Sequence, residues 1–192
     1  VQVRHFLDSI SCVPVMGNEE TLENTRVIDV GTGAGFPGVP VKICLPDIRL
    51  TLLEATGKKA AFLTHLVEVL ELQNVDIVTA RAEELGRDAA HRERYDYVLA
   101  RAVAALPVLA ELMLPLCRPG GSCIAHKKGD VPAEVRAAAR AVSVMGGGVV
   151  SLRQVDSIAG EPGRYLVVME KTGPTPAGYP RRPGVPARRP VL

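Results

Sequence analysis

Hydrophobic positions along this chain follow two alternating spacings from Arg26 onward. Short runs rich in β-branched residues recur, and between them apolar residues return every three or four positions, as on one face of a helix. Short buried strands that alternate with helices are typical of βαβ units, in which a parallel sheet is covered on both faces. The short runs predict strands at residues 27–30, 49–54, 75–80, 95–100 and 121–126.

The longer stretches predict helices, and the end of the chain departs from the alternation. Helices are expected at residues 3–10, 37–45, 58–72, 106–116 and 133–145. Two further strand-like runs, 149–155 and 165–170, are separated only by a Gly/Pro turn at residues 160–163, which leaves no room for a crossover helix. We therefore expect an α/β fold whose mostly parallel sheet ends in an antiparallel hairpin.

Length and composition fit one domain with a separate tail. A chain of 192 residues with 47% hydrophobic side chains can bury roughly 70% of the surface that it exposes when unfolded, so it needs neither disulfides nor a structural metal. After Thr172, six prolines are interleaved with arginine and glycine. Such a segment cannot bury a core of its own and is expected to be extended or disordered. We divide the chain into a helical start and connector (1–25), a core domain (26–171) and a Pro/Arg-rich tail (172–192).

The net charge is +2, but the charges are unevenly distributed. The tail holds four arginines and no acid, so 19 of the 23 basic side chains remain in residues 1–171, against 21 acidic ones. A balance so close to neutral excludes a uniformly basic nucleic-acid binder and an acidic disordered protein, since both need a strong imbalance of charge. The positive charge is concentrated in Arg181, Arg182, Arg188 and Arg189.

Cysteine and histidine spacing predicts no metal site. The four cysteines form no C-x-x-C pair and the four histidines no H-E-x-x-H motif, so we interpret the cysteines as buried reduced thiols. No stretch approaches the ~18 uninterrupted apolar residues of a transmembrane helix, and the N-terminal residues lack the pattern of a signal peptide. These features predict a cytoplasmic protein without a membrane partner.

A glycine-rich turn from Asp29 to Gly38 directly follows the first predicted strand. The missing Cβ atoms at Gly31, Gly33 and Gly35 let a ligand lie against the backbone, and the next helix begins there with free N–H groups. Two ligand classes use this construction, dinucleotides and S-adenosylmethionine.

Charge favours S-adenosylmethionine over a dinucleotide. Gly33-x-Gly35-x-x-Gly38 matches the dinucleotide fingerprint, with Glu54 about 20 residues later, but that pattern alone is weak evidence. Asp29 at the strand tip would repel a pyrophosphate, whereas it would favour the sulfonium and α-amino group of S-adenosylmethionine. Glu54 ends the second strand, where its carboxylate can accept hydrogen bonds from the ribose hydroxyls of either ligand. The alternative for Glu54 is a solvated strand end.

Several short segments occur in the order seen in one bacterial family. They are Arg4–Ser9, the Asp29–Gly38 turn, Leu52–Glu54 with Lys58–Leu63, Arg81–Glu84, Tyr95–Asp96, Ala100–Ala102, Lys128–Gly129 and, in the tail, Tyr179–Pro186. On these segments the chain resembles the small-subunit ribosomal RNA methyltransferase G family, also called glucose-inhibited division protein B, over essentially its whole length. The resemblance implies a class I Rossmann-like methyltransferase with seven strands, helices on both faces and S-adenosylmethionine as cofactor. It also implies methylation of N7 of a guanine at position 527, in the 530 loop of 16S rRNA.

The resemblance further implies roles for individual residues. Gly31 and Phe36 would line the methionine and sulfonium side of the cofactor, and Ala82 and Glu83 would bracket the adenine. Each assignment has a structural alternative: Phe36 as a core residue between turn and helix, and Glu83 as an acid in the first turn of a helix.

Arg101 would face both cofactor and substrate at the carboxyl edge of the sheet, where open α/β sheets bind their ligands. Guanine N7 carries a free lone pair, so no general base is needed, and catalysis consists of holding N7 in line with the methyl–sulfur bond. We therefore assign Arg101 a positioning or electrostatic role. The alternative is a structural ion pair with Asp96 or Glu83.

Two other functions stay open from the residues alone. The Gly33–Gly38 fingerprint would serve an NAD(P)-dependent oxidoreductase, and a non-catalytic RNA-binding module would use the lysine pairs and the tail. We expect a monomer whose partner is 16S rRNA in the 30S subunit, with the four tail arginines on phosphates. Family members carry a helical segment before Arg4, whereas this chain begins at Val1 without a methionine. We expect either a fragment or a start set too late.

Overall fold

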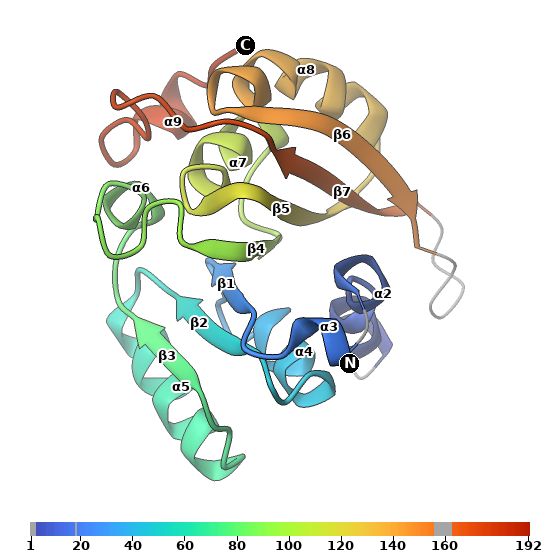
Figure 1. The fold of residues 1–192 in the computed structure, drawn as a ribbon, viewed down its shortest axis with the longest axis vertical. Helices are drawn as coiled ribbons and strands as arrows, with labels where there is room; N and C mark the ends of the chain where they lie inside the picture. Colours follow the sequence, from blue (N-terminus) through green and yellow to red (C-terminus); the bar gives the residue numbers. More distant parts are fainter. Residues whose placement is uncertain (1–2, 18, 156–162) are drawn as a thin grey trace.

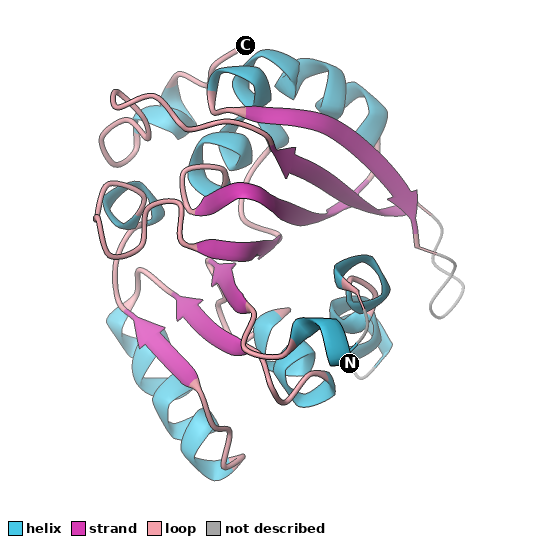
Figure 2. Ribbon diagram, viewed as in Figure 1, coloured by secondary structure: helices cyan, strands magenta, loops and turns pink. Residues whose placement is uncertain are grey.

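The structure, a computed structural model, describes residues 3–17, 19–155 and 163–192 (Figure 1). The strands within these residues are β1 (Arg26–Val30), β2 (Arg49–Leu53), β3 (Val75–Val78), β4 (Tyr95–Arg101), β5 (Cys117–Lys128), β6 (Gly147–Gln154) and β7 (Arg164–Lys171). They form one seven-stranded sheet in the order β3-β2-β1-β4-β5-β7-β6 (Figure 2). All the strands predicted from the sequence are present, with ends that differ by up to a few residues.

The sheet is parallel except for one strand. β1 pairs in parallel with β2 and β4, and these continue the parallel pairing to β3 and β5. β7 is antiparallel to both β5 and β6, so the predicted hairpin is confirmed, with β6 at the sheet edge. Residues 160–162 of its predicted turn lie outside the described residues. The strand order reverses between β1 and β4, and ligands of open α/β sheets bind at the carboxyl ends of strands beside such a point.

Two apolar clusters cover the sheet, one on each face. On β1, Ile28 belongs to the cluster that contains α7 (Leu106–Met113) and α8 (Val131–Val144), whereas Val27 belongs to the cluster of α4 (Gly38–Cys44) and α5 (Gly57–Val69). Successive strand residues point to opposite faces, so a strand covered on both sides must be apolar without alternation. The prediction of helices on both faces is confirmed (Figure 1).

Single-turn helices lie where the sequence predicted a connector or a loop, apart from the first two, which together cover the predicted helix at 3–10. They are the π-helix η1 (Val3–Leu7), α1 (Asp8–Ile10), α2 (Val13–Met16), α3 (Glu19–Leu22), α6 (Ala82–Leu85) and α9 (Val185–Arg188). One turn contains too few apolar repeats for a period of 3.6 residues to be visible in the sequence.

The tail, residues 172–192, packs against the domain, contrary to the prediction of an extended or disordered segment. Thr175, Pro180 and Pro186 are buried, and α9 packs on α7. In Figure 1 the tail (red) leaves β7 and passes between α6 and α8. The prediction failed because arginine side chains of the domain bind carbonyl oxygens of the tail. Such contacts leave no trace in the hydrophobic pattern.

Candidate cofactor and substrate site

The glycine-rich turn between β1 and α4 is held from inside by Asp29. Oδ2 of Asp29 accepts a hydrogen bond from the N–H of Gly38 at 2.8 Å, and a Cβ on Gly38 would lie only 2.9 Å from that oxygen. Asp29 is fully buried, and its Oδ1 has no hydrogen-bond partner among the described residues. Burial raises the pKa of this carboxyl to about 6. Asp29 therefore shapes the turn, whereas the sequence argument placed its charge directly against the ligand.

Glu54, immediately after β2, closes the other side of the turn. Its Oε2 accepts a hydrogen bond from the N–H of Gly33 at 3.1 Å, and its Oε1 accepts one from Thr56 at 2.9 Å. The residue is buried, so it is not a solvated strand end. A Cβ on Gly33 would meet only the carbonyl oxygen of Gly31, 4.0 Å away, which leaves this part of the turn open. A carboxylate has about four lone-pair sites, so each Glu54 oxygen keeps capacity for a ribose hydroxyl.

A first pocket, of about 230 Å³, lies at the carboxyl ends of β1, β2 and β3, and we call it the cofactor pocket. Gly31, Ala82 and Glu83, three residues assigned to the cofactor from the sequence, line it together. Its apolar wall includes Val30, Leu53, Ala80, Val103, Val108 and Leu112. An apolar slot with one carboxylate fits an adenine ring, whose amino group donates hydrogen bonds. The volume is below the about 300–1,000 Å³ of complete ligand sites, so the slot fits part of a cofactor.

Arg101 and Phe36 face each other, and neither of them lines the cofactor pocket. The guanidinium of Arg101, at the end of β4, lies 5.1 Å from the centroid of the Phe36 ring, which is a cation–π distance. Its Nη1 donates a hydrogen bond to a carboxylate oxygen of Asp8 at 3.1 Å, and its Nη2 lies 3.0 Å from Nδ1 of His5. The side chain of Arg101 is thus held from several directions at the carboxyl edge of the sheet.

The alternative ion pairs considered for Arg101 are wrong. Asp96 pairs with Arg118, at 2.6 Å, and Glu83 accepts the N–H of Gly184 at 2.9 Å. Glu83 does lie in the first turn of α6, as its alternative assignment expected, but its side chain also lines the cofactor pocket. The partner of Arg101 is instead the carboxylate of Asp8, near the N-terminus, which sequence reasoning did not assign.

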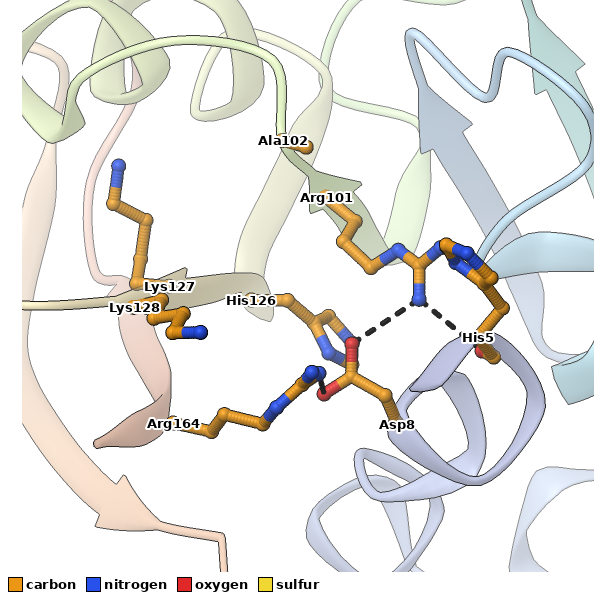
Figure 3. Close-up of a pocket in the computed structure, with 8 residues that line it drawn as sticks. All are labelled: His5, Asp8, Arg101, Ala102, His126, Lys127, Lys128 and Arg164. Carbon is orange, nitrogen blue, oxygen red and sulfur yellow. Dashed lines mark hydrogen bonds and ion pairs between the residues drawn. The ribbon is translucent and has the colours of Figure 1, made fainter. Parts of the chain in front are cut away.

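A second pocket, of about 500 Å³, opens on the other side of Arg101 (Figure 3). We call it the cationic pocket, and it is lined by His5, Asp8, Arg101, Ala102, His126, Lys127, Lys128 and Arg164. Asp8 lies between two arginines, because its other oxygen accepts Nη1 of Arg164 at 2.7 Å. One carboxylate among several cations leaves the pocket positive, which suits the phosphate of a nucleotide.

His126 is a buried residue in the lining of the cationic pocket. It is 7% exposed, and its Nε2 has no hydrogen-bond partner among the described residues. Burial lowers the pKa of the imidazole to about 4, so His126 is neutral at pH 7. Because Nε2 itself is shielded from solvent, the imidazole gives the pocket an uncharged wall and no exposed hydrogen-bonding atom at Nε2.

Residues 101–104 separate the two pockets. Arg101 and Ala102 line the cationic pocket, whereas Val103 and Ala104 line the cofactor pocket. Nζ of Lys127 donates a hydrogen bond to the carbonyl oxygen of Ala104 at 2.9 Å and fixes this stretch. Ala102 has a φ of 56°, a left-handed conformation that costs a non-glycine residue about 1–3 kcal/mol and that clusters at functional sites. Two pockets on either side of four residues suit the transfer of a group between two ligands.

Comparison with known proteins identifies the family. The matching family model, described as rRNA small subunit methyltransferase G, covers residues 1–159. The ribosomal RNA small subunit methyltransferase G of Roseiflexus castenholzii is 51% identical over 192 residues, which is 100% of this chain and 80% of that protein. The chain belongs to the rRNA small subunit methyltransferase G family. The protein of the same name from Dehalococcoides mccartyi is 48% identical over 194 residues, with the same two coverages.

Solved methyltransferase structures share the fold of this chain. A predicted O-methyltransferase from Agrobacterium tumefaciens superposes with a TM-score of 0.69 at 19% identity, over 88% of this chain and 81% of that one. A SAM-dependent methyltransferase from Aquifex aeolicus gives 0.63 at 17% identity, over 88% and 92%. The likeness concerns the fold, and it confirms the predicted class I Rossmann-like architecture.

Several residues of the candidate site were missed by sequence reasoning. Asp8 and His126, with Arg164, belong to three elements far apart in the chain, and Gly184 and Ala187 belong to the tail. Asp8 and Gly184 carried a signal, because both lie in segments that resemble the family. The others acquire their place through tertiary packing, which no local motif records.

Three further expectations concern membranes, metals and thiols. Within the described ranges, no helix is long and apolar enough to cross a membrane. The same residues contain no group of three or more His, Cys, Asp or Glu side chains placed to hold a metal ion. All four cysteines are free thiols; three are buried, as predicted, whereas Cys44 is half-buried. Burial raises the pKa of Cys12 to about 12, so this thiol is a poor nucleophile.

Proposed function

We propose that this protein transfers a methyl group from S-adenosylmethionine to N7 of a guanine in 16S rRNA, at position 527 of the 530 loop. The observation that carries the proposal is the pair of pockets on either side of residues 101–104, one suited to the cofactor and one to a nucleotide. Membership of a family named for methylation of the small-subunit rRNA supports it. Ribosomal subunits are cytoplasmic, and we assign the enzyme to the same compartment.

The chemistry asks little of the protein beyond binding and orientation. S-adenosylmethionine, when bound, supplies an electrophilic methyl group on a cationic sulfur. N7 of guanine already has a free lone pair, so no side chain has to remove a proton before the transfer. Correct placement of two reactants contributes roughly 7–11 kcal/mol to such a reaction. We therefore assign no general base.

Residues of the glycine turn and of three strand ends hold the cofactor in this proposal. Gly33 leaves space beside the turn, and Glu54, bonded to the N–H of Gly33, is placed to accept the ribose hydroxyls. Ala82 and Glu83 enclose the adenine, and Gly31, which lines the same pocket, lies towards the methionine part of the cofactor.

Arg101 and Phe36 position the reacting groups between the two pockets. The guanidinium is fixed over the Phe36 ring and by Asp8, so it presents a positive charge at a defined place. A fixed charge needs no reorganisation when the substrate arrives, which is the general advantage of a preorganised site. The neutral imidazole of His126 forms an uncharged part of the cationic pocket wall, and the surrounding cations attract the phosphate of the target nucleotide.

Methyl transfer to ribosomal subunits tests the proposal. Tritiated S-adenosylmethionine with 30S subunits should label 16S rRNA, and the label should map to N7-methylguanosine at position 527. Label at another base, or none, would contradict it. Arg101→Ala should abolish turnover with the fold retained, and Arg118→Ala is the matched control, since it removes an ion-paired arginine outside both pockets. Equal turnover of the two variants would reject the role of Arg101.

Calorimetry distinguishes the alternatives. We expect S-adenosylhomocysteine to bind without RNA and NADH not to bind. Binding of NADH instead would favour an oxidoreductase, and binding of RNA with neither small ligand would favour an RNA-binding module.

A further inference from the structure

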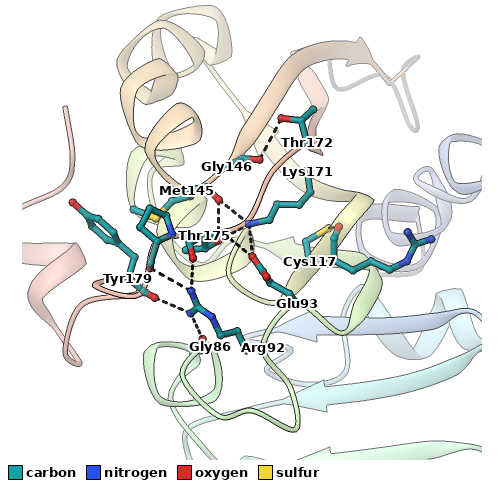
Figure 4. Close-up of polar contacts among 12 residues, drawn as sticks. Gly86, Arg92, Glu93, Cys117, Met145, Gly146, Lys171, Thr172, Thr175 and Tyr179 are labelled. Carbon is teal, nitrogen blue, oxygen red and sulfur yellow. Dashed lines mark hydrogen bonds and ion pairs between the residues drawn. The ribbon is translucent and has the colours of Figure 1, made fainter.

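The tail begins with an anchor of buried polar groups (Figure 4). Nζ of Lys171, fully buried at the end of β7, donates hydrogen bonds to the carbonyl oxygen of Met145 at 2.7 Å and to the hydroxyl of Thr175. Glu93 pairs with the same ammonium at 3.2 Å and accepts the N–H of Thr175 at 2.6 Å. These groups satisfy one another only when the first residues of the tail lie in this place.

Two arginines of the loop after α6 bind the middle of the tail. Arg92 donates hydrogen bonds to the carbonyl oxygens of Thr175 at 2.7 Å and of Tyr179 at 2.8 Å (Figure 4). Arg87 donates one to the carbonyl oxygen of Pro180 at 2.6 Å. Because these acceptors are backbone atoms, the contacts fix the path of the chain rather than one side chain.

Arg181 fastens the next part of the tail onto α7. Its backbone N–H and three side-chain hydrogen bonds, 2.6–3.1 Å long, all go to the carboxylate of Glu111, whose side chain is 1% exposed. A bidentate arginine is the strongest partner for a buried carboxylate. The removal of Arg181 would leave that charge buried and unpaired.

The residues that follow Arg181 line the cofactor pocket. Gly184 and Ala187 are part of its wall, and the N–H of Gly184 binds Oε1 of Glu83, which is in the same wall. The tail is thus joined to the very carboxylate that we assign to the adenine.

We propose that the tail forms the adenine-side wall of the cofactor pocket, and that the Arg181–Glu111 pair positions this wall. This inference rests on the proposed function, since it concerns the same cofactor. It replaces the expectation that all four tail arginines contact RNA phosphates, because Arg181 is already engaged within the protein. A wall held in place before the ligand arrives adds affinity, since less of the chain has to be ordered on binding.

Binding of S-adenosylhomocysteine to the full chain, measured by calorimetry without RNA, tests the inference. Arg181→Ala should weaken binding by about tenfold or more, whereas Arg182→Ala, at the exposed neighbouring position, should not. Ala187→Leu should also weaken binding, because the larger side chain enters the pocket from a docked tail. Its matched control is Ala177→Leu, at an exposed tail position outside the pocket.

A second ligand tests whether the tail contacts the adenine side of the cofactor. 5′-Methylthioadenosine lacks the amino-acid part of the cofactor, and it should lose affinity for Arg181→Ala and Ala187→Leu as S-adenosylhomocysteine does. If the wild type binds S-adenosylhomocysteine and both variants bind it like their controls, the inference is overturned. A loss confined to S-adenosylhomocysteine would overturn the adenine-side placement. Failure of the wild type to bind would instead overturn the proposed function. If Arg181→Ala does not fold, Ala187→Leu still tests whether the tail forms a wall of the cofactor pocket.

Discussion

Two buried ionisable residues near the carboxyl edge of the sheet respond to pH in opposite directions. Burial lowers the pKa of His126 from 6.5 to about 4, and it raises the pKa of Asp29 from 3.8 to about 6. The folded protein resists protonation of His126, so this residue costs stability progressively as the pH falls from 6.5 towards 4. The folded protein resists ionisation of Asp29, so its contribution is complete below pH 3.8 and is lost as the pH rises towards 6. Between these limits the two effects oppose each other.

Single replacements should separate the two effects. His126→Gln should flatten the loss of unfolding free energy between pH 6.5 and 4, by up to about 3 kcal/mol, since one pKa unit corresponds to about 1.4 kcal/mol. Asp29→Asn should make the same loss steeper. Urea unfolding at a series of pH values measures both. His65→Gln, at an exposed position of α5, is the control and should leave the profile unchanged. Superimposable profiles for all four proteins would contradict the buried titrations.

Three glycines should respond differently to alanine. Gly38→Ala places its Cβ 2.7 Å from Leu52 and should cost about 1–3 kcal/mol of unfolding free energy. Gly33→Ala meets open space but has a φ of 61°, so it should cost about 1 kcal/mol and also weaken S-adenosylhomocysteine binding. Gly57→Ala, the first residue of α5, has nothing within 4 Å and should gain about 0.4–1 kcal/mol. Equal unfolding free energies for the three variants would refute this ranking.

At the scale of elements, the sequence predicted the strands and helices whose apolar positions repeat along the chain. It missed the contacts between residues that are far apart in the chain. Strands and long helices can be recognised from several regularly spaced apolar positions, whereas one-turn elements such as α6 and α9 contain too few of them. The expected helix at 58–72 ends at Val69, because Glu71 has a φ of 51° and leaves the helical region. The place of Arg101 followed from the rule that parallel strands end at one edge. Its partner Asp8 lies 93 residues away and only packing reveals it.

Asp8 should contribute more to stability than an exposed ion-paired acid such as Asp96, because it joins the N-terminal helices to the sheet. Its side chain and those of Arg101 and Arg164 are all nearly buried, so Asp8→Asn should cost on the order of 3 kcal/mol and expose residues 3–17 to faster hydrogen exchange. Turnover should fall, since Arg101 loses its support, while S-adenosylhomocysteine affinity should persist.

The matched control for Asp8 is Asp96→Asn. Its partner Arg118 is 48% exposed, so the change should cost less than about 1 kcal/mol. Equal costs at the two positions would show that Asp8 is an ordinary surface partner. A large loss of S-adenosylhomocysteine affinity in Asp8→Asn would show that the two pockets are not separate.

At the scale of the whole molecule, the near-neutral total of +2 hides a division within the tail. Arg181 turns inward onto Glu111, whereas Arg182, Arg188 and Arg189 are exposed. The tail therefore has an inner side that completes the protein and an outer side that carries positive charge. A count of charges along the sequence cannot distinguish the two, because pairing with Glu111 cancels Arg181 without changing the composition.

The exposed and the inward-facing arginines of the tail should have different effects on RNA binding. Replacing Arg182, Arg188 and Arg189 by alanine should flatten the salt dependence of binding to a 530-loop RNA by up to about 2 in logarithmic slope, at roughly 0.7 per phosphate contact on single strands. Arg181→Ala should leave that slope unchanged, because its charge is already neutralised, yet it should weaken S-adenosylhomocysteine binding. An unchanged slope in the triple variant would remove the tail from the RNA surface. A slope change in Arg181→Ala would contradict its inward pairing. The salt slope reports on the three exposed arginines and the cofactor affinity reports on Arg181, so the two measurements test the two sides of the tail independently.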